Sequence, residues 1–180
     1  MSNPWFALQV RGRYEDTIAT NLAGKGYECF HPVHKCRRRW SDRFKEVEQP
    51  LFPGYIFCRL NVIYRLPILT TPGVISIVGV AKIPVPVDET EIAAIRLAVN
   101  SGLPSGPWPF LQIGRKVRID YGPLCGLEGI LIDFKGATRL ILSVTLLQRS
   151  VAVELENAWV TPLPPSVLQT PGPGNLSRRQ

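Results

Sequence analysis

The stretch Gln49–Leu60 reads Gln-Pro-Leu-Phe-Pro-Gly-Tyr-Ile-Phe-Cys-Arg-Leu and places three aromatic residues and two prolines in one short run. Proline has no N–H to donate to a sheet, and glycine after proline allows a sharp turn, so we predict a turn at Pro53-Gly54 and a strand that begins at Tyr55. Side chains alternate along a strand, which puts Tyr55 and Phe57 on one face. Either both faces of this strand are buried in protein, or the face with Tyr55 and Phe57 is left for a partner molecule.

The composition is that of an ordinary water-soluble protein with room for one large or two small domains, at 180 residues, 45% hydrophobic and 19% charged. No apolar run approaches the roughly 20 residues of a membrane span, and the first residues lack the charged and apolar regions of a signal peptide. The four cysteines form no Cys-x-x-Cys pair, which favours reduced thiols over a disulfide framework. We therefore expect a cytoplasmic protein with no membrane partner.

The net charge of +7 is concentrated in one segment. Lys35–Lys45 holds six basic residues against one acidic residue, whereas Leu111–Pro164 holds six basic against five acidic. If nucleic acid is a partner, the N-terminal half meets it, because attraction to the phosphate backbone needs concentrated positive charge. The alternative is that Lys35–Lys45 is only a solvated hairpin tip, which needs no ordered contact.

The first hundred residues predict a sheet with flanking helices. Trp5–Val10 is typical of a buried strand, and the four-residue spacing of apolar side chains from Tyr14 predicts a helix after it. Tyr27–His34 is extended but contains a proline, which favours an edge strand. We then expect a hairpin with Lys35–Lys45 as its loop, followed by the strand that begins at Tyr55.

A second long helix is marked by its N-terminal signals. Asp88 is its predicted cap, and Glu91 completes the spacing of a capping box, in which the side chain bonds back to the backbone of the cap residue. After this helix, Asn100–Pro109 contains too much Gly, Pro and Ser for regular structure. We therefore expect residues 1–100 to form one domain and residues 101–110 to be a flexible linker.

Residues 111–164 consist of short strands separated by turn signals, and five strands in about fifty residues favour a small β-barrel. Glycines every few residues and many β-branched side chains favour strands over helices in this domain. Residues 165–180 are rich in Pro, Gly, Ser and Gln, which predicts a disordered tail. The expected fold class is α+β, with an N-terminal α/β sandwich linked to a five-stranded barrel.

Two sets of motifs occur in a fixed order between Trp5 and Leu163. The N-terminal set is Trp5-Phe6-Ala7-Leu8, Leu51-Phe52-Pro53-Gly54-Tyr55-Ile56-Phe57, Thr71-Pro72-Gly73-Val74 followed by Gly79, and Pro84-Val85-Pro86 before an acidic helix. The C-terminal set is Gly114-x-x-Val117-Arg118-Ile119-x-x-Gly122-Pro123-Leu124-x-Gly126-x-x-Gly129, which is similar to the KOW motif. Together they resemble the NusG/Spt5 family of transcription elongation factors, with an NGN domain and an SH3-like KOW barrel. The prolines and aromatics around Phe52 are closest in style to the specialised RfaH-type antitermination paralogues.

The resemblance implies a non-enzymatic factor without a cofactor that binds RNA polymerase, contacts nucleic acid in the elongation complex and promotes processivity. The family's N-terminal domain binds the clamp helices of the largest polymerase subunits through a hydrophobic depression, and the matching positions are Phe52, Tyr55 and Phe57. In RfaH-type proteins the first helix and a later turn face the non-template DNA strand, and the matching residues are Arg11, Arg13, Thr17, Asn21 and Thr71. To these we add the basic residues Arg37, Arg38 and Arg39 as a predicted nucleic-acid contact.

The resemblance also implies a partner for the barrel, which is either a small-subunit ribosomal protein or the termination factor Rho. The matching loop residues are Leu124, Leu146, Leu147 and Arg149. RfaH-type proteins can hide the polymerase-binding face under a C-terminal domain refolded as helices, but the glycines and β-branched residues here do not suit helices. We therefore expect a monomer with a permanent barrel and with the face of Phe52, Tyr55 and Phe57 open without an activating signal.

Other classes of function are weaker. Cys29, His31, His34 and Cys36 are suitable zinc ligands, but on one strand the first two face one way and the last two the other. A catalytic site lacks support, since there are only two histidines, no nucleophile in a recognisable elbow and no Gly-rich phosphate loop. The remaining alternative is an RNA-binding KOW module acting on the ribosome, against which the nearly neutral barrel counts.

Overall fold

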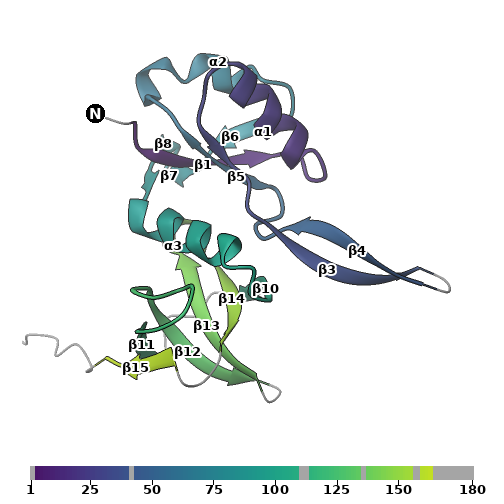
Figure 1. Ribbon diagram of the computed structural model, residues 1–180. Helices are drawn as coiled ribbons and strands as arrows, with labels where there is room; N and C mark the ends of the chain where they lie inside the picture. The colour runs from purple at the N-terminus through teal and green to yellow at the C-terminus, as the bar shows by residue number, and fades with distance from the viewer. Residues whose placement is uncertain (1–2, 41–42, 110–113, 135–136, 156–158, 164–180) are drawn as a thin grey trace, which may run out of the picture.

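The computed structural model describes residues 3–40, 43–109, 114–134, 137–155 and 159–163, so the predicted tail 165–180 lies outside the described residues. Figure 1 shows an N-terminal domain, a β-barrel packed beneath it and a long hairpin that projects from the junction. The elements are β1 (Trp5–Val10), α1 (Glu15–Gly24), β2 (Cys29–Phe30), β3 (Val33–Trp40), β4 (Arg43–Pro50), β5 (Tyr55–Arg59), η1 (Val62–Tyr64), α2 (Leu66–Leu69), β6 (Val74–Ile77), β7 (Gly79–Val80), β8 (Ile83–Pro84), β9 (Pro86–Val87), α3 (Glu89–Asn100), β10 (Ser105–Pro109), β11 (Arg115–Ile119), β12 (Glu128–Phe134), β13 (Ala137–Val144), η2 (Thr145–Leu147), β14 (Arg149–Leu155) and β15 (Val160–Pro162).

The N-terminal sheet is antiparallel, with strand order β2-β5-β1-β6 and β9 paired to β1. The predicted strand Trp5–Val10 and the helix after Tyr14 are confirmed as β1 and α1. The segment Tyr27–His34 contributes β2, which lies at the edge of the sheet as predicted. The sheet therefore places β5 near its centre, between β2 and β1.

The predicted turn before β5 is confirmed in detail. The carbonyl of Phe52 accepts from the Tyr55 amide at 3.0 Å, and Gly54 has a φ of 80°. Proline at the second position and a positive φ at the third define a type II turn. The Gly54 amide also donates to the carboxylate of Glu15 at 2.9 Å, and this carboxylate is buried, so the turn is tied to the start of α1.

The alternation along β1 and β5 divides the apolar side chains between two faces of the sheet. The face toward α1 carries Phe6, Leu8, Ile56 and Cys58, with Ile18 and Leu22 from the helix. The opposite face carries Trp5, Ala7 and Phe57, with Ile92 and Ile95 from α3. Strand β5 is thus buried on both faces, which is the first of the two alternatives for this strand.

The C-terminal domain is a six-stranded antiparallel sheet with strand order β10-β14-β13-β12-β11-β15. Strands β11 to β15 confirm the five that the sequence predicts, and β10 is additional. The flexible-linker prediction for residues 101–110 is wrong for Ser105–Pro109, because these residues form β10 and pair with β14 along their whole length. The reason is that β10 is an edge strand, where proline is tolerated because one side of the strand needs no N–H donor.

The basic segment also differs from the prediction. Lys35–Lys45 was expected to be a loop, but most of it lies in the paired strands β3 and β4, whose register runs from Val33 opposite Pro50 to Trp40 opposite Arg43. Two opposite-charge pairs face each other across this ladder, Lys35 with Glu48 and Arg37 with Glu46, and such cross-strand pairs favour a continued sheet, although Arg38 lies opposite Lys45. The hairpin itself is confirmed, and it extends well beyond both domains (Figure 1). Among the described helices, none has the length and apolar character needed to traverse a bilayer.

Candidate functional site

The two domains meet where α3 packs against β13 of the barrel (Figure 1). One continuous buried cluster includes Phe52 and Phe57 from the N-terminal domain and Val144 and Val151 from the barrel. Phe52 is 1% exposed and Phe57 0% exposed. The prediction that the aromatic face is open is therefore wrong for these two residues. Their burial removes large apolar surfaces from water, which is strongly favourable.

Tyr55 is the member of the predicted polymerase-binding set that reaches the rim of this domain contact. Its side chain is half-buried, and the guanidinium of Arg149 lies 5.0 Å from the centre of its ring. A cation over an aromatic face contributes about 0.5–1 kcal/mol at a site exposed to water. A predicted polymerase-binding residue and a predicted barrel partner-binding residue thus contact each other.

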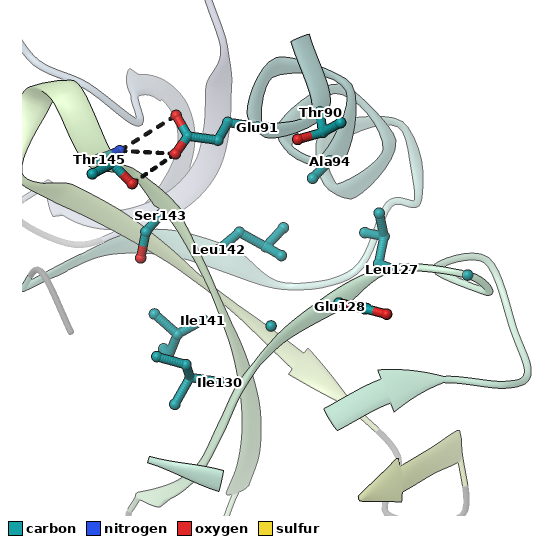
Figure 2. A pocket seen from close by; sticks show the side chains of 12 residues that line it. Thr90, Glu91, Ala94, Leu127, Glu128, Ile130, Ile141, Leu142, Ser143 and Thr145 are labelled. Carbon is teal, nitrogen blue, oxygen red and sulfur yellow. Dashed lines mark hydrogen bonds between the residues drawn. The ribbon is translucent and has the colours of Figure 1, made fainter. Parts of the chain in front are cut away.

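Glu91 forms a polar contact between the domains, as Figure 2 shows. Its carboxylate accepts from the Thr145 hydroxyl at 2.7 Å and from the Thr145 amide at 3.2 Å. Asp88 caps α3 as predicted, because it accepts from the Thr90 amide at 2.7 Å. The capping-box prediction for Glu91 is wrong, since its carboxylate bonds to the barrel. The contact between Glu91 and the barrel was not predicted from the sequence, because the capping-box spacing from Asp88 already gave Glu91 a local role.

A groove of about 740 Å³ lies beside this contact, between α3 and the barrel strands β12 and β13 (Figure 2). Ala94 from the helix and Leu127, Ile130 and Ile141 from the barrel line it. The domains are therefore in close contact only along part of α3.

The residues predicted to bind a partner of the barrel also lie at or near the domain contact. Leu124 is fully buried, and Leu146 and Leu147 are half-buried against the same apolar cluster. Arg149 is exposed, apart from its position over Tyr55. In this conformation Leu124 is not available to a partner, and the others are only partly available.

The residues just before α1 and those on its exposed side form a second surface. Arg11, Arg13, Thr17 and Asn21 are all exposed. The Arg11 amide donates to the Gly73 carbonyl at 2.8 Å, which brings the later turn beside the start of the helix, as the resemblance implies. Arginines of this kind can contact phosphate or stack on an unpaired base.

Thr71 is placed differently from the prediction. It is 2% exposed, its hydroxyl donates to the Pro67 carbonyl at 2.9 Å, and it accepts from the Lys25 ammonium at 2.7 Å. Because the buried Thr71 hydroxyl already donates one hydrogen bond and accepts another, it is not available for a contact to DNA. Lys25, which sequence reasoning missed, brings a positive charge to this place. The available signal was its spacing, because Thr17, Asn21 and Lys25 recur every four residues.

The base of the basic hairpin touches the barrel. His34 in β3 lies close to Gly106 in β10, and burial lowers the pKa of His34. Arg37, Arg38 and Arg39 belong to the outer part of β3, opposite Glu46, Lys45 and Phe44 in register.

Across the ranges that the structure describes, no three His, Cys, Asp or Glu side chains are grouped to hold a metal ion.

Comparison with known proteins agrees with this architecture. The family model for NusG, described as a transcription termination factor, matches residues 3–96. The transcription termination/antitermination protein NusG of Campylobacter jejuni is 30% identical over 86% of this chain and 94% of its own length. The corresponding Lactococcus lactis protein is 28% identical over 84% of this chain and 89% of its own length. A solved structure of domain interaction in Thermotoga maritima NusG is similar in fold, with a TM-score of 0.54 and 21% identity over 87% of this chain and 95% of that chain.

The α+β domain, the β-rich second domain and these relatives define a transcription factor of the termination and antitermination class, which is not an enzyme. The chain belongs to the NusG family.

Proposed function

We propose that the N-terminal domain binds the clamp helices of RNA polymerase and promotes processive elongation. The observation that carries this proposal is the family match over residues 3–96, which includes all of the aromatic segment and the first helix. Within that segment, Tyr55 is half-buried at the rim of the domain contact. Because Phe52 and Phe57 are buried, they support the position of Tyr55 in this conformation and reach polymerase only after the domains separate.

The exposed residues of the first helix are the proposed contact to the non-template DNA strand. Arg11, Arg13, Thr17 and Asn21 lie at or near α1, and Lys25 continues the same helical spacing. Arginine side chains can stack on unpaired bases, which a transcription bubble supplies. The barrel is proposed to bind a small-subunit ribosomal protein or Rho through Leu146, Leu147 and Arg149.

Binding of either proposed partner depends on whether the two domains are in contact. Arg149 lies over Tyr55, and Phe52 and Phe57 share one buried cluster with the barrel. The residues proposed to bind polymerase and the residues proposed to bind the partner of the barrel therefore bury part of their surfaces against each other. Either partner must compete with the domain contact, and its apparent affinity is reduced by the fraction of protein that is open.

The Tyr55→Ala variant tests the polymerase contact. We expect binding to RNA polymerase to weaken by about 1–3 kcal/mol, as for an aromatic anchor at an interface. Loss of the Arg149 contact favours domain opening and acts in the opposite direction, so weaker binding points to Tyr55 itself. The measurement is a binding titration with purified polymerase. Tyr121→Ala removes a tyrosine that is 68% exposed on the barrel and serves as the control. Equal affinities for the two variants would limit the direct contribution of Tyr55 to the roughly 0.5–1 kcal/mol that loss of the Arg149 contact can offset.

The hairpin is tested by changing Arg37, Arg38 and Arg39 together to Ser. If each meets a phosphate, affinity for the elongation complex falls, and the slope of log K against log salt becomes less steep by about 2–3, according to the kind of strand. The matched control changes the exposed basic residues of β11, which are Arg115, Lys116 and Arg118, to Ser. A salt slope that equals the wild-type value would make the hairpin a solvated extension.

A further inference from the structure

Strands β2 and β5 place two thiols directly opposite each other. Cys29 and Cys58 are partners in the antiparallel register, and their Sγ atoms lie 3.6 Å apart in a hydrogen bond. Both are free cysteines. Cys58 faces α1, on the opposite face of β5 from Phe57. The pair is therefore separate from the aromatic surface proposed to bind polymerase.

The backbone around this pair is compatible with a covalent bond. The Arg59 amide donates to the Glu28 carbonyl at 2.9 Å, so residues 28 and 59 form a hydrogen-bonded pair. The next pair along an antiparallel ladder is non-hydrogen-bonded, and there opposite Cα atoms lie about 4.5 Å apart. Disulfides span Cα separations of about 4.4–6.8 Å. Cys29 and Cys58 thus need side-chain rotation but no strand movement to reach bonding distance.

We propose that Cys29 and Cys58 are a modification site at which a small-molecule disulfide of the glutathione type introduces a reversible cross-strand disulfide. Cys29 is half-buried on an edge strand, whereas Cys58 is 0% exposed, so an oxidant in solution meets Cys29 first. The hydrogen bond between the two thiols lowers the pKa of Cys29 and raises the pKa of Cys58. This favours Cys29 as the attacking thiolate and Cys58 as the resolving thiol.

The reaction proceeds in two exchanges. The Cys29 thiolate attacks one sulfur of the glutathione disulfide, the sulfur–sulfur bond breaks, and one glutathione thiolate leaves. Cys58 then loses its proton, and its sulfur displaces the second glutathione from Cys29. The protein gives up two protons and two electrons, and the oxidant becomes two glutathione thiols. The product encloses the β3–β4 hairpin and the Pro53-Gly54 turn in one covalent loop and fixes the edge strand β2 to β5.

The test uses the full-length protein, reduced and then exposed to oxidised glutathione without denaturant. Peptide mapping by mass spectrometry is expected to find Cys29 joined to Cys58, and excess dithiothreitol should remove the bond. Because the fold holds the two thiols together, the yield should be at least about tenfold higher in the native protein than in urea-unfolded protein. The exposed Cys125 should take up a glutathione adduct in the same sample, which shows that the oxidant is active.

Two variants make the result specific. Cys58→Ala removes the resolving thiol, so the reaction should stop at a glutathione adduct on Cys29. Cys125→Ser should leave the Cys29–Cys58 bond unchanged. If Cys58→Ala fails to fold, the peptide map of the wild-type protein is sufficient to test the proposal. A native wild-type protein that carries only glutathione adducts, or a yield no higher than in urea, would overturn the proposal.

Discussion

Phe57→Ala is expected to lower the free energy of unfolding by about 3–5 kcal/mol, as for other buried phenylalanines. Phe57 is 0% exposed, and its ring meets Phe52 edge to face at 5.4 Å and Phe30 at 6.2 Å between centroids. Its removal leaves a cavity inside the buried cluster that includes residues of the sheet, α3 and the barrel. The loss is a large part of the roughly 5–15 kcal/mol that stabilises a typical protein. Urea unfolding followed by circular dichroism measures it.

Tyr55→Ala is the matched comparison for this prediction, because Tyr55 lies two residues earlier on the same face of β5. Its side chain is only half-buried, so its removal should cost less than about 2 kcal/mol. If Phe57→Ala instead keeps near wild-type stability and loses polymerase binding, the aromatic face is a binding surface rather than a core. The pair of variants thus separates the two alternatives for this strand.

The sequence predicted those elements whose signals are local. Pro53-Gly54 specifies a type II turn by its own backbone preferences, and Asp88 caps α3 through the amide two residues away. The five barrel strands follow from β-branched runs between turn residues. In each case the residues that determine the structure are neighbours in the chain.

The domain contact has no such local signature. Arg149 reaches Tyr55, and Thr145 reaches Glu91, from the far end of the chain. Glu91 in particular had a sufficient local explanation as a capping-box residue, and only the folded barrel provides the competing donors. The edge strand β10 was missed for a related reason, since its prolines are compatible with a strand only if one side stays unpaired.

The surface proposed to contact nucleic acid agrees with the prediction only in part. The exposure of Arg11, Arg13, Thr17 and Asn21 agrees with the prediction, although their contact with DNA remains a proposal. Thr71 occupies the expected turn but is turned inward to Pro67 and Lys25. A motif match locates a turn in the chain, whereas the direction of a short polar side chain depends on which donors and acceptors the fold brings near it.

The double variant Glu91→Ala with Arg149→Ala is expected to bind RNA polymerase up to about 30-fold more tightly than the wild type. Removing the Thr145 hydrogen bonds and the cation over Tyr55 weakens the domain contact by about 2 kcal/mol. If the closed state predominates, the open fraction and the apparent affinity rise by the same factor. The measurement is a binding titration, accompanied by hydrogen exchange of the α3 amides, which keep their backbone acceptors in the variant and should exchange faster as the contact opens.

Glu128→Ala is the control for this double variant. Glu128 lines the same groove between α3 and the barrel, and within the described residues it makes no hydrogen bond to the helix. The substitution removes the same carboxylate charge as Glu91→Ala and should leave both the affinity and the exchange rate unchanged. Faster exchange of the α3 amides without tighter binding would show that the domain contact opens but does not limit access to polymerase. Tighter binding for Glu128→Ala as well would assign the effect to the loss of a carboxylate beside the groove instead of to domain opening.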